Sequence, residues 1–414
     1  MRGLANTARF LIGTMLASAV ASAQAPPAGA PISYPRMGNN HEILVGPDTW
    51  FRFGFVIQAW LSDLQSPTRV DGSDGSDSLD AYLRRSSFFV RAQLLKNIGA
   101  FVLIDTANLG RSTQTGAGTD ALPFVVSRSF SPAMVGDAFA EVKLAGDALM
   151  ISGGLMFVPF SHNGLQANST RFVLDGSSTA VVQFNAATSA GRDTGFQLKG
   201  YEADDRLEWR LFVGSGLRQP ATGANPLANN GPRIAAHLQV QLFDVDKGYV
   251  NVGHTFGRKK RLGLCAGFDY QKGDDLDAYR AFSAGVFGDW PLSGEARPEG
   301  GDEILFVTEY YHYDGGQTFP GVALASQNDL DAEVAYYNKG LRSSIFGKLE
   351  LQKYSDDANQ AANRRWLAGG IKYFVWESYC NLTLFYQRID FPDADPGMVN
   401  GTNQFTLQLQ VSYY

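Results

Sequence analysis

Seven arginines are the residues in this sequence whose type and spacing best suit the binding of a solute. Six of them fall on the polar positions of segments in which apolar and polar residues alternate, and the seventh lies in a long polar stretch between two such segments. An arginine guanidinium is a planar fork that holds a carboxylate or a phosphate, so a group of them raises the local concentration of anions. The seven are Arg52, Arg85, Arg91, Arg171, Arg192, Arg210 and Arg233.

A purely structural role for these arginines stays open. Glu141, Asp193 and Glu208 occupy similar polar positions in neighbouring segments. Pairs of arginine and carboxylate between adjacent segments would act as braces and would leave little net charge to attract a solute. The sequence does not decide between the two interpretations.

Neither a catalytic site nor a metal site is indicated. The five histidines are far apart in the sequence, and no local motif places a serine or an aspartate beside one of them as a hydrolase requires. The stretch "DGSDGSDSLD" has aspartates at 71, 74 and 77, a spacing that differs from the one-three-five pattern of a calcium loop. We therefore expect no enzyme activity, no cofactor and no metal ion.

The segments that carry the arginines alternate with a period of two, which predicts β-strands. In "WFRFGFVIQAWL" every odd-numbered residue from 51 to 61 is apolar. Arg52 and Gln58 lie on the opposite face. Similar segments recur to the end of the chain, and we count about 17 of roughly 8 to 13 residues, close to the length of a tilted membrane strand.

The connections between these segments are of two kinds. Four short ones are rich in Gly, Asn and Asp and predict hairpin turns at 145–147, 202–205, 244–247 and 338–340. Five long polar ones lie at 65–83, 109–135, 158–191, 216–231 and 391–402. Between about 244 and 313 the alternation of short and long connections breaks down. Because a closed bacterial barrel needs an even number of strands, we expect 16 strands, with 18 as the alternative.

A transmembrane antiparallel β-barrel explains this all-β pattern better than a soluble sandwich does. A single sheet with so many strands and one apolar face would need a core on one side only, whereas a cylinder turns that face to lipid and leaves no free edge. Aromatic residues near the segment ends suit the two membrane interfaces. The final segment, "NQFTLQLQVSYY", should pair with the first one near 50–62, with its apolar face in register with Tyr413.

The N-terminus predicts export. Arg2 and Arg9 precede an apolar run that is too short to span a bilayer, and Ala21-Ser22-Ala23 suits cleavage by signal peptidase. We expect a signal peptide at 1–23, a periplasmic N-terminal segment at 24–46 and the barrel at 47–414. Cleavage of the signal peptide would remove Arg2 and Arg9 and take the net charge from −6 to −8, which disfavours a nucleic-acid partner.

Three stretches resemble, in order and spacing, the phosphate-selective porin O and P family of Gram-negative outer membranes. The resemblance implies a barrel of about 16 strands, often a homotrimer, whose third long loop folds into the lumen. The stretches are "LRRSSFFVRAQLLKNIGAFVLIDTANLG" (83–110), "DAFAEVKLAGDALMISGGLMFVPFSHNGLQANSTRFVLD" (137–175) and "GRDTGFQLKGYEADDRLEWRLFVGSG" (191–216).

The resemblance carries over to a few positions. Arg84, Arg85 and Arg91 would lie on one strand, Pro159 and Phe160 would enter the constriction loop, and Arg192 and Asp193 would follow it. His162 falls within the same predicted loop. Phosphate-selective members have lysine and arginine ladders, whereas this chain has only 11 lysines, so full phosphate selectivity does not transfer.

These observations together predict a passive diffusion channel of the outer membrane, narrowed by loop 158–191, for small hydrophilic solutes. Arg171 would fold toward Arg85 and Arg91, opposite acids at 331, 333 and 350, and give a mild preference for anions such as phosphate. The expected partners are outer-membrane lipid and lipopolysaccharide, small solutes and two further copies of the chain. The alternative is a barrel that is not a channel, either a surface enzyme or an adhesin.

Overall fold

The computed structural model describes most of the chain beyond residue 42. The predicted signal peptide, His41, aspartates 71, 74 and 77, and residues 179–190 of the predicted constriction loop lie outside the described residues. The described ranges are 43–64, 68–69, 78–119, 122–128, 133–178, 191–216, 231–272, 278–314, 317–319, 322–323, 326–394 and 399–413.

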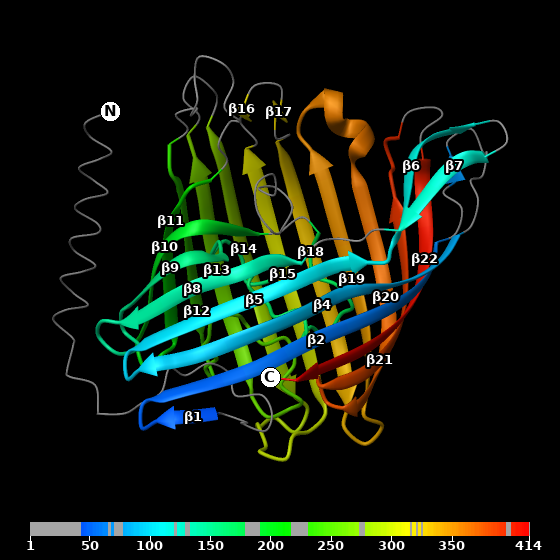
Figure 1. The fold of residues 1–414 in the computed structure, drawn as a ribbon. Coiled ribbons are helices and arrows are strands. Elements are labelled where there is room, and N and C mark those ends of the chain that lie inside the picture. Colours follow the sequence, from blue (N-terminus) through cyan, green and yellow to red (C-terminus); the bar gives the residue numbers. More distant parts are fainter. Residues whose placement is uncertain are drawn as a thin grey trace.

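Sixteen strands in these ranges form one closed antiparallel barrel, drawn in Figure 1. Fifteen pairings join each barrel strand to the next one along the chain. The strands are β2 (Thr49–Leu64), β4 (Ser78–Leu95), β5 (Ile98–Leu109), β8 (Met134–Lys143), β9 (Met150–Phe157), β10 (Arg192–Glu202), β11 (Leu207–Gly214), β12 (Arg233–Gln241), β13 (Arg261–Gln271), β14 (Tyr279–Pro291), β15 (Glu303–Asp314), β18 (Gln327–Asn338), β19 (Ser343–Tyr354), β20 (Arg364–Trp376), β21 (Cys380–Asp390) and β22 (Val399–Tyr413).

The last strand closes the cylinder against the first. β22 pairs with β2 from Phe55 opposite Tyr413 to Leu64 opposite Gln404, so the predicted strand number of 16 and the predicted partner of the terminal strand are both confirmed. Inside the lumen, Gln58 Nε2 donates to Gln410 Oε1 over 2.8 Å. The closing seam is therefore held by side chains as well as by the backbone ladder.

Several short strands and one short helix lie outside the 16 barrel strands. β1 pairs with the first residues of β2, and β3 pairs with β22. Two hairpins and one helix lie in the long connections. These elements are β1 (Ile43–Gly46), β3 (Thr68–Arg69), β6 (Ser112–Thr119), β7 (Leu122–Arg128), β16 (Gln317–Phe319), β17 (Val322–Ala323) and the 3-10 helix η1 (Asp357–Ala362). Among the described residues, no helix has the length and apolar character needed to cross a bilayer.

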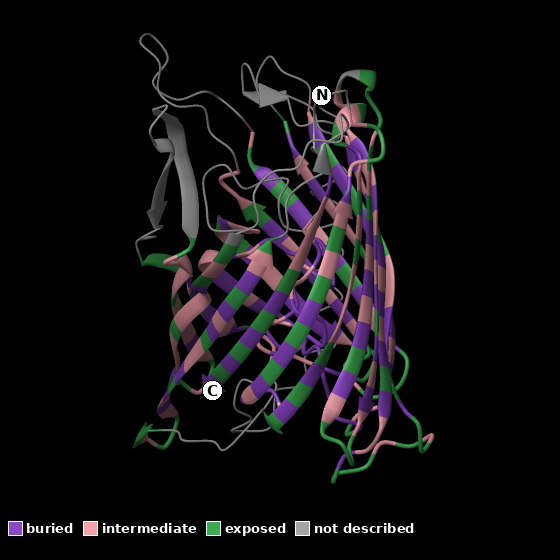
Figure 2. Cartoon of the chain, turned by 90° about the vertical axis from the view of Figure 1, so that its right-hand side faces the viewer, coloured by how far each residue is buried: buried purple, intermediate pink, exposed green. Residues whose placement is uncertain are grey.

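Burial alternates along the strands, as the bands in Figure 2 show. In β22, Leu407 and Leu409 are exposed on the outside, whereas Gln408 and Gln410 are buried inside. In β2, Phe53 is exposed and Arg52 is buried. This pattern is the reverse of that of a water-soluble protein, because the apolar side chains form the outer surface and the polar ones face the interior.

One predicted turn is wrong. Residues 244–247 do not form a hairpin turn, because the whole connection between β12 and β13 runs over 242–260 and contains no strand paired in the barrel. The alternating stretch after Lys247 mimics a strand, but the backbone of Asn251 bonds to Leu165 and Ala167 inside the lumen instead of to a neighbouring strand. This segment accounts for the irregular spacing in the sequence after residue 244.

Candidate lumen constriction

The described part of the third long connection, residues 158–178, folds into the lumen and is here called the inner loop. Pro159 and Phe160 lead into it from β9 and are buried. Phe160 packs among aromatic residues of β14 and β15, and its carbonyl oxygen accepts a hydrogen bond from Ser283 Oγ over 2.5 Å. The entry of the loop is thus fixed to the wall, and the prediction that the third loop folds into the lumen is confirmed for its described residues.

Carboxylates of the wall hold the backbone of the inner loop. Glu309 on β15 accepts from the backbone N–H of His162 over 2.8 Å and of Asn163 over 2.7 Å. The Asn163 side chain donates to Asp331 Oδ2 over 2.8 Å. The His162 ring stacks on Phe287 with 3.7 Å between ring centroids, and burial lowers its pKa to about 3, so the ring is neutral at neutral pH.

The far end of the inner loop is held in the same way on β19. Glu350 accepts from Ser178 through the backbone N–H over 2.9 Å and through the hydroxyl over 2.7 Å. Lys348 pairs with Glu350 over 2.7 Å and donates to the carbonyl oxygen of Gly176 over 2.7 Å. The four carboxylates beneath the loop are at most 2% exposed, so the loop seals them from water: Glu309, Asp331, Glu333 and Glu350.

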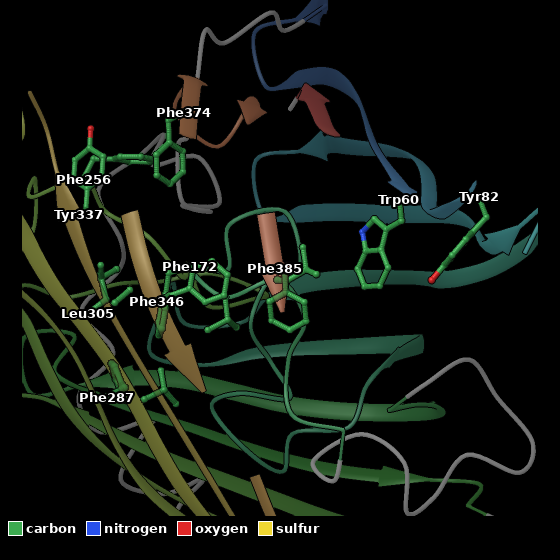
Figure 3. Close-up of a cluster of buried hydrophobic side chains, with 14 residues drawn as sticks. Trp60, Tyr82, Phe172, Phe256, Phe287, Leu305, Tyr337, Phe346, Phe374 and Phe385 are labelled. Atoms are coloured by element: carbon green, nitrogen blue, oxygen red, sulfur yellow. The ribbon is translucent and has the colours of Figure 1, made fainter. Parts of the chain in front are cut away.

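An apolar anchor seats the middle of the inner loop. Phe172, Val173 and Leu174 belong to a buried cluster of lumen-facing side chains, in which Phe172 lies near Phe346 and Phe385 (Figure 3). Burial of a side chain as large as phenylalanine contributes about 1.5–3 kcal/mol. The sequence reasoning missed this anchor, although "FVLD" is an apolar run inside a long polar connection, and that contrast is the signal that could have revealed it.

Arg171 braces the inner loop from within. Its guanidinium donates to Asn163 Oδ1 and Gln166 Oε1, each over 2.8 Å, and to the carbonyl oxygen of Asn163. Gly176 lies against this guanidinium, since a Cβ there would stand 2.5 Å from Arg171 Cζ. The hydrogen bonds of Arg171 named here thus stay within its own loop.

A second segment enters the lumen from the opposite end. Residues 242–260, here called the inner turn, meet the inner loop where the N–H of Asn251 donates to Leu165 over 2.8 Å and Gly253 donates to Thr170 Oγ1 over 2.9 Å. Tyr249 packs on Phe139 with 4.6 Å between ring centroids. The two segments therefore form one connected structure inside the barrel.

Three of the seven arginines pair with carboxylates of the wall. Arg192 Nε donates to Asp137 Oδ1 over 2.9 Å and its Nη2 donates to Asp137 Oδ2 over 3.0 Å. Arg210 bonds Glu208 Oε1 over 2.6 Å and also donates to carbonyl oxygens of the inner turn.

Arg233 forms the third of these pairs. Its Nε donates to Asp269 Oδ1 over 2.9 Å. Asp193 lies 3.9 Å from Arg233 and accepts from the backbone N–H groups of Thr194 and Gly216. Pairs of this kind match the structural interpretation left open by the sequence.

The remaining arginines lie on β2 and β4. Arg52 lies over the ring of Trp50 at 5.5 Å, and Arg91 lies over the ring of Phe101 at 5.9 Å. Arg85, together with its neighbour Arg84, binds Asp175 of the inner loop. The structure thus places Arg85 and Arg91 on one wall and separates them from the pairs on β10, β11 and β12.

The lumen is unevenly filled. The lumen-facing residues of β15 and β18 are buried, whereas several of those on β4 and β5 are half-buried, among them Phe89, Arg91, Phe101 and Asp105. Water therefore reaches the wall that carries Arg85 and Arg91. Within the described residues, no group of three or more His, Cys, Asp or Glu side chains is arranged to hold a metal ion.

Comparisons with known proteins bear on the fold. No family model matches the chain, and no curated protein matches its sequence. Solved structures do match: OprB of Pseudomonas putida has a TM-score of 0.59 and 9% identity, over 88% of this chain and 94% of that chain. This chain has the fold of an outer-membrane porin.

Two further structures agree with this fold. The anion-selective porin of Comamonas acidovorans has a TM-score of 0.53 and 8% identity, over 88% of this chain and all of that chain. The outer membrane channel DcaP of Acinetobacter baumannii has a TM-score of 0.53 and 11% identity, over 88% and 97% of the two chains. Identities this low establish the porin fold alone.

Proposed function

We propose that the chain is a passive diffusion channel of a Gram-negative outer membrane that admits small hydrophilic solutes. The observation that carries the proposal is the closed barrel with an apolar outer face and a half-buried, charged wall along β4 and β5. A cylinder of this kind satisfies every strand edge in lipid while offering water a polar path. We further propose that a signal peptide at 1–23 directs export and that the barrel contacts lipopolysaccharide. The chain would form a homotrimer and belong to the phosphate-selective porin O and P family.

The outer face supplies a first test. Leu384 is 58% exposed near the middle of β21. If this face meets hydrocarbon, Leu384→Arg should lower the free energy of unfolding by about 2–4 kcal/mol in lipid vesicles. Leu341→Arg in an exposed turn, where the side chain is 71% exposed, is the control and should change it little. Unfolding monitored by tryptophan fluorescence measures both, and equal stability of the two variants would contradict a membrane-facing surface.

The proposed channel has a mild preference for anions such as phosphate. The carboxylates at 309, 331, 333 and 350 are sealed beneath the inner loop, whereas Arg85 and Arg91 lie on the wall that water reaches. A charge in a narrow lumen acts strongly because the low-dielectric wall focuses its field. The acids of this chain therefore influence a permeating ion less than their number suggests.

Reversal potentials in a salt gradient test this preference. The wild type should be mildly anion-selective, and Arg85→Ala or Arg91→Ala should reduce the selectivity because each removes a positive charge from the half-buried wall. Arg365→Ala is a matched control, since Arg365 has a 54% exposed side chain that pairs with Asp390. A cation-selective wild type would overturn the preference, as would lumen variants that behave like the control.

A barrel that does not conduct is the second candidate, either a surface enzyme or an adhesin. The observation that favours it is the extent to which the inner loop and the inner turn fill one side of the lumen. Planar-bilayer recording separates the candidates, because a folded wild-type barrel that passes no ionic current would not be a channel.

A further inference from the structure

Arg84, Arg85 and Asp175 form a compact ionic cluster, here called the clasp. Arg84 Nη2 lies 2.8 Å from Asp175 Oδ2, and Arg85 Nη2 lies 2.6 Å from Asp175 Oδ1. Two guanidinium groups from β4 thus share a single carboxylate from the inner loop. The cluster carries one net positive charge, and its geometry is the one that arginine forks offer to a carboxylate or a phosphate.

The clasp is built into the wall on the arginine side. Arg85 Nη1 donates to Gln58 Oε1 over 2.8 Å, and Arg84 Nη1 donates to Asn108 Oδ1 over 3.4 Å. Arg84 also lies over the ring of Trp60 at 5.4 Å. These contacts come from β2 and β5 and do not involve Asp175, so the two guanidiniums keep supports on the wall when the carboxylate departs.

The clasp is partly exposed to water. The side chains of Arg84 and Asp175 are each 23% exposed and that of Arg85 is 12% exposed, whereas the other carboxylates that hold the inner loop are at most 2% exposed. Burial alone would raise the pKa of Asp175, but the charges of Arg85 and Arg84 outweigh it and hold the pKa well below its ordinary value. The carboxylate therefore stays ionised, and it blocks both arginines throughout the neutral range.

Asp175 can leave the arginines without unseating the loop. The carbonyl oxygens of Asp175 and Gly176 accept hydrogen bonds from Lys348 over 3.1 and 2.7 Å, and Phe172 is anchored in the apolar cluster. Rotation of the Asp175 side chain, which also gives up the N–H of Gly176 that Oδ1 accepts over 3.2 Å, would then expose two guanidiniums.

We propose that the clasp is an oxyanion-binding site in which Asp175 acts as a resident competitor, so that a solute bearing a carboxylate or phosphate group displaces Asp175 during passage. This inference rests on the proposed channel function. A tethered competitor is present at a high effective concentration, which keeps the affinity for a free anion low. Low affinity allows release, and release is what conduction through a binding site requires.

The test measures binding and current separately in the full-length, detergent-purified protein. Equilibrium dialysis with labelled inorganic phosphate or labelled acetate gives binding without any need for conductance. Planar-bilayer recording gives the block of chloride current by the same two anions. Asp175→Asn should bind the preferred anion about tenfold more tightly than the wild type, because it frees both arginines. Arg84→Ala/Arg85→Ala should abolish the binding, and tighter binding of phosphate or of acetate identifies the preferred class.

Asp105→Asn is the matched control. Asp105 lies half-buried on the same wall and accepts a hydrogen bond from Ser87 Oγ over 2.7 Å, so the substitution removes one negative charge without opening the clasp. It should change anion binding much less than Asp175→Asn does. Asp175→Ser provides a second variant with the same expected result.

The outcomes distinguish the site from the channel. Equal anion affinity in the wild type and in both Asp175 variants would overturn the clasp, whatever the current. Tighter binding in those variants supports the clasp even when the wild type passes no current, and in that case only the channel function fails.

Discussion

Removal of residues 162–177, with the ends joined by a short Gly-Ser linker, should raise the single-channel conductance at least about twofold. The inner loop crosses the lumen and seals the wall at β15, β18 and β19, so its loss widens the path while the backbone ladder of the barrel remains. The variant should also unfold at a lower temperature, because Glu309 loses the two N–H groups that it accepts from, Lys348 loses the carbonyl oxygen of Gly176, and the buried apolar cluster loses Phe172.

Planar-bilayer recording measures the conductance, and the shift of the folded band on unheated gels checks the barrel. Deletion of residues 357–360 in the η1 helix is the control, since this connection is largely exposed and should leave the conductance unchanged. An unaltered conductance in a folded 162–177 deletion would mean that the inner loop does not limit the current.

Replacement of residues 248–256 by Asn-Gly should also widen the path, from the other end of the barrel. The inner turn packs against the inner loop at Asn251 and fills the lumen beside β10 and β11. Its loss deprives Arg210 and Lys199 of the carbonyl oxygens that they donate to, and a buried group left without a partner costs about 1–3 kcal/mol. We therefore expect higher conductance, more frequent current fluctuations from a loosened inner loop, and a lower unfolding temperature.

Single-channel recordings and thermal unfolding of the same preparation measure these changes. The matched control replaces Gly340 and Leu341, in an exposed turn at the same end of the barrel, by Asn-Gly. If the inner-turn variant kept wild-type conductance and a steady current, the inner turn would be a support for the wall and not part of the constriction.

The strands were predictable because each one carries its own evidence. In β2 and β22 the alternation of apolar and polar residues sets which face turns outward, and the structure places Phe53 outside and Gln410 inside accordingly. The same reasoning gave a wrong prediction for the inner turn, because apolar and polar residues also alternate there. Its backbone bonds to the inner loop, and no local pattern distinguishes a backbone paired in a strand from one paired with a distant loop.

The partners within the lumen were not predictable for a related reason. Glu309 and His162 are 147 residues apart, and Ser178 and Glu350 are 172 apart. The sequence pattern around a lumen-facing carboxylate is the same whether the carboxylate contacts water or accepts a hydrogen bond from a loop N–H. The folding of the third loop into the lumen was predicted from a family resemblance, whereas its acidic supports appear only once the cylinder brings distant strands together.

The seating of the inner loop also has a consequence for the order of folding. Gln410, three residues before the end of β22, donates to the carbonyl oxygen of Ser169 over a separation of 241 residues. Contacts across such long stretches of chain form slowly, because the entropy of closing the intervening chain is lost before the contact is gained. The inner loop can therefore acquire its full set of contacts only after the last strand has docked, and a chain truncated before Gln410 would never complete its interior.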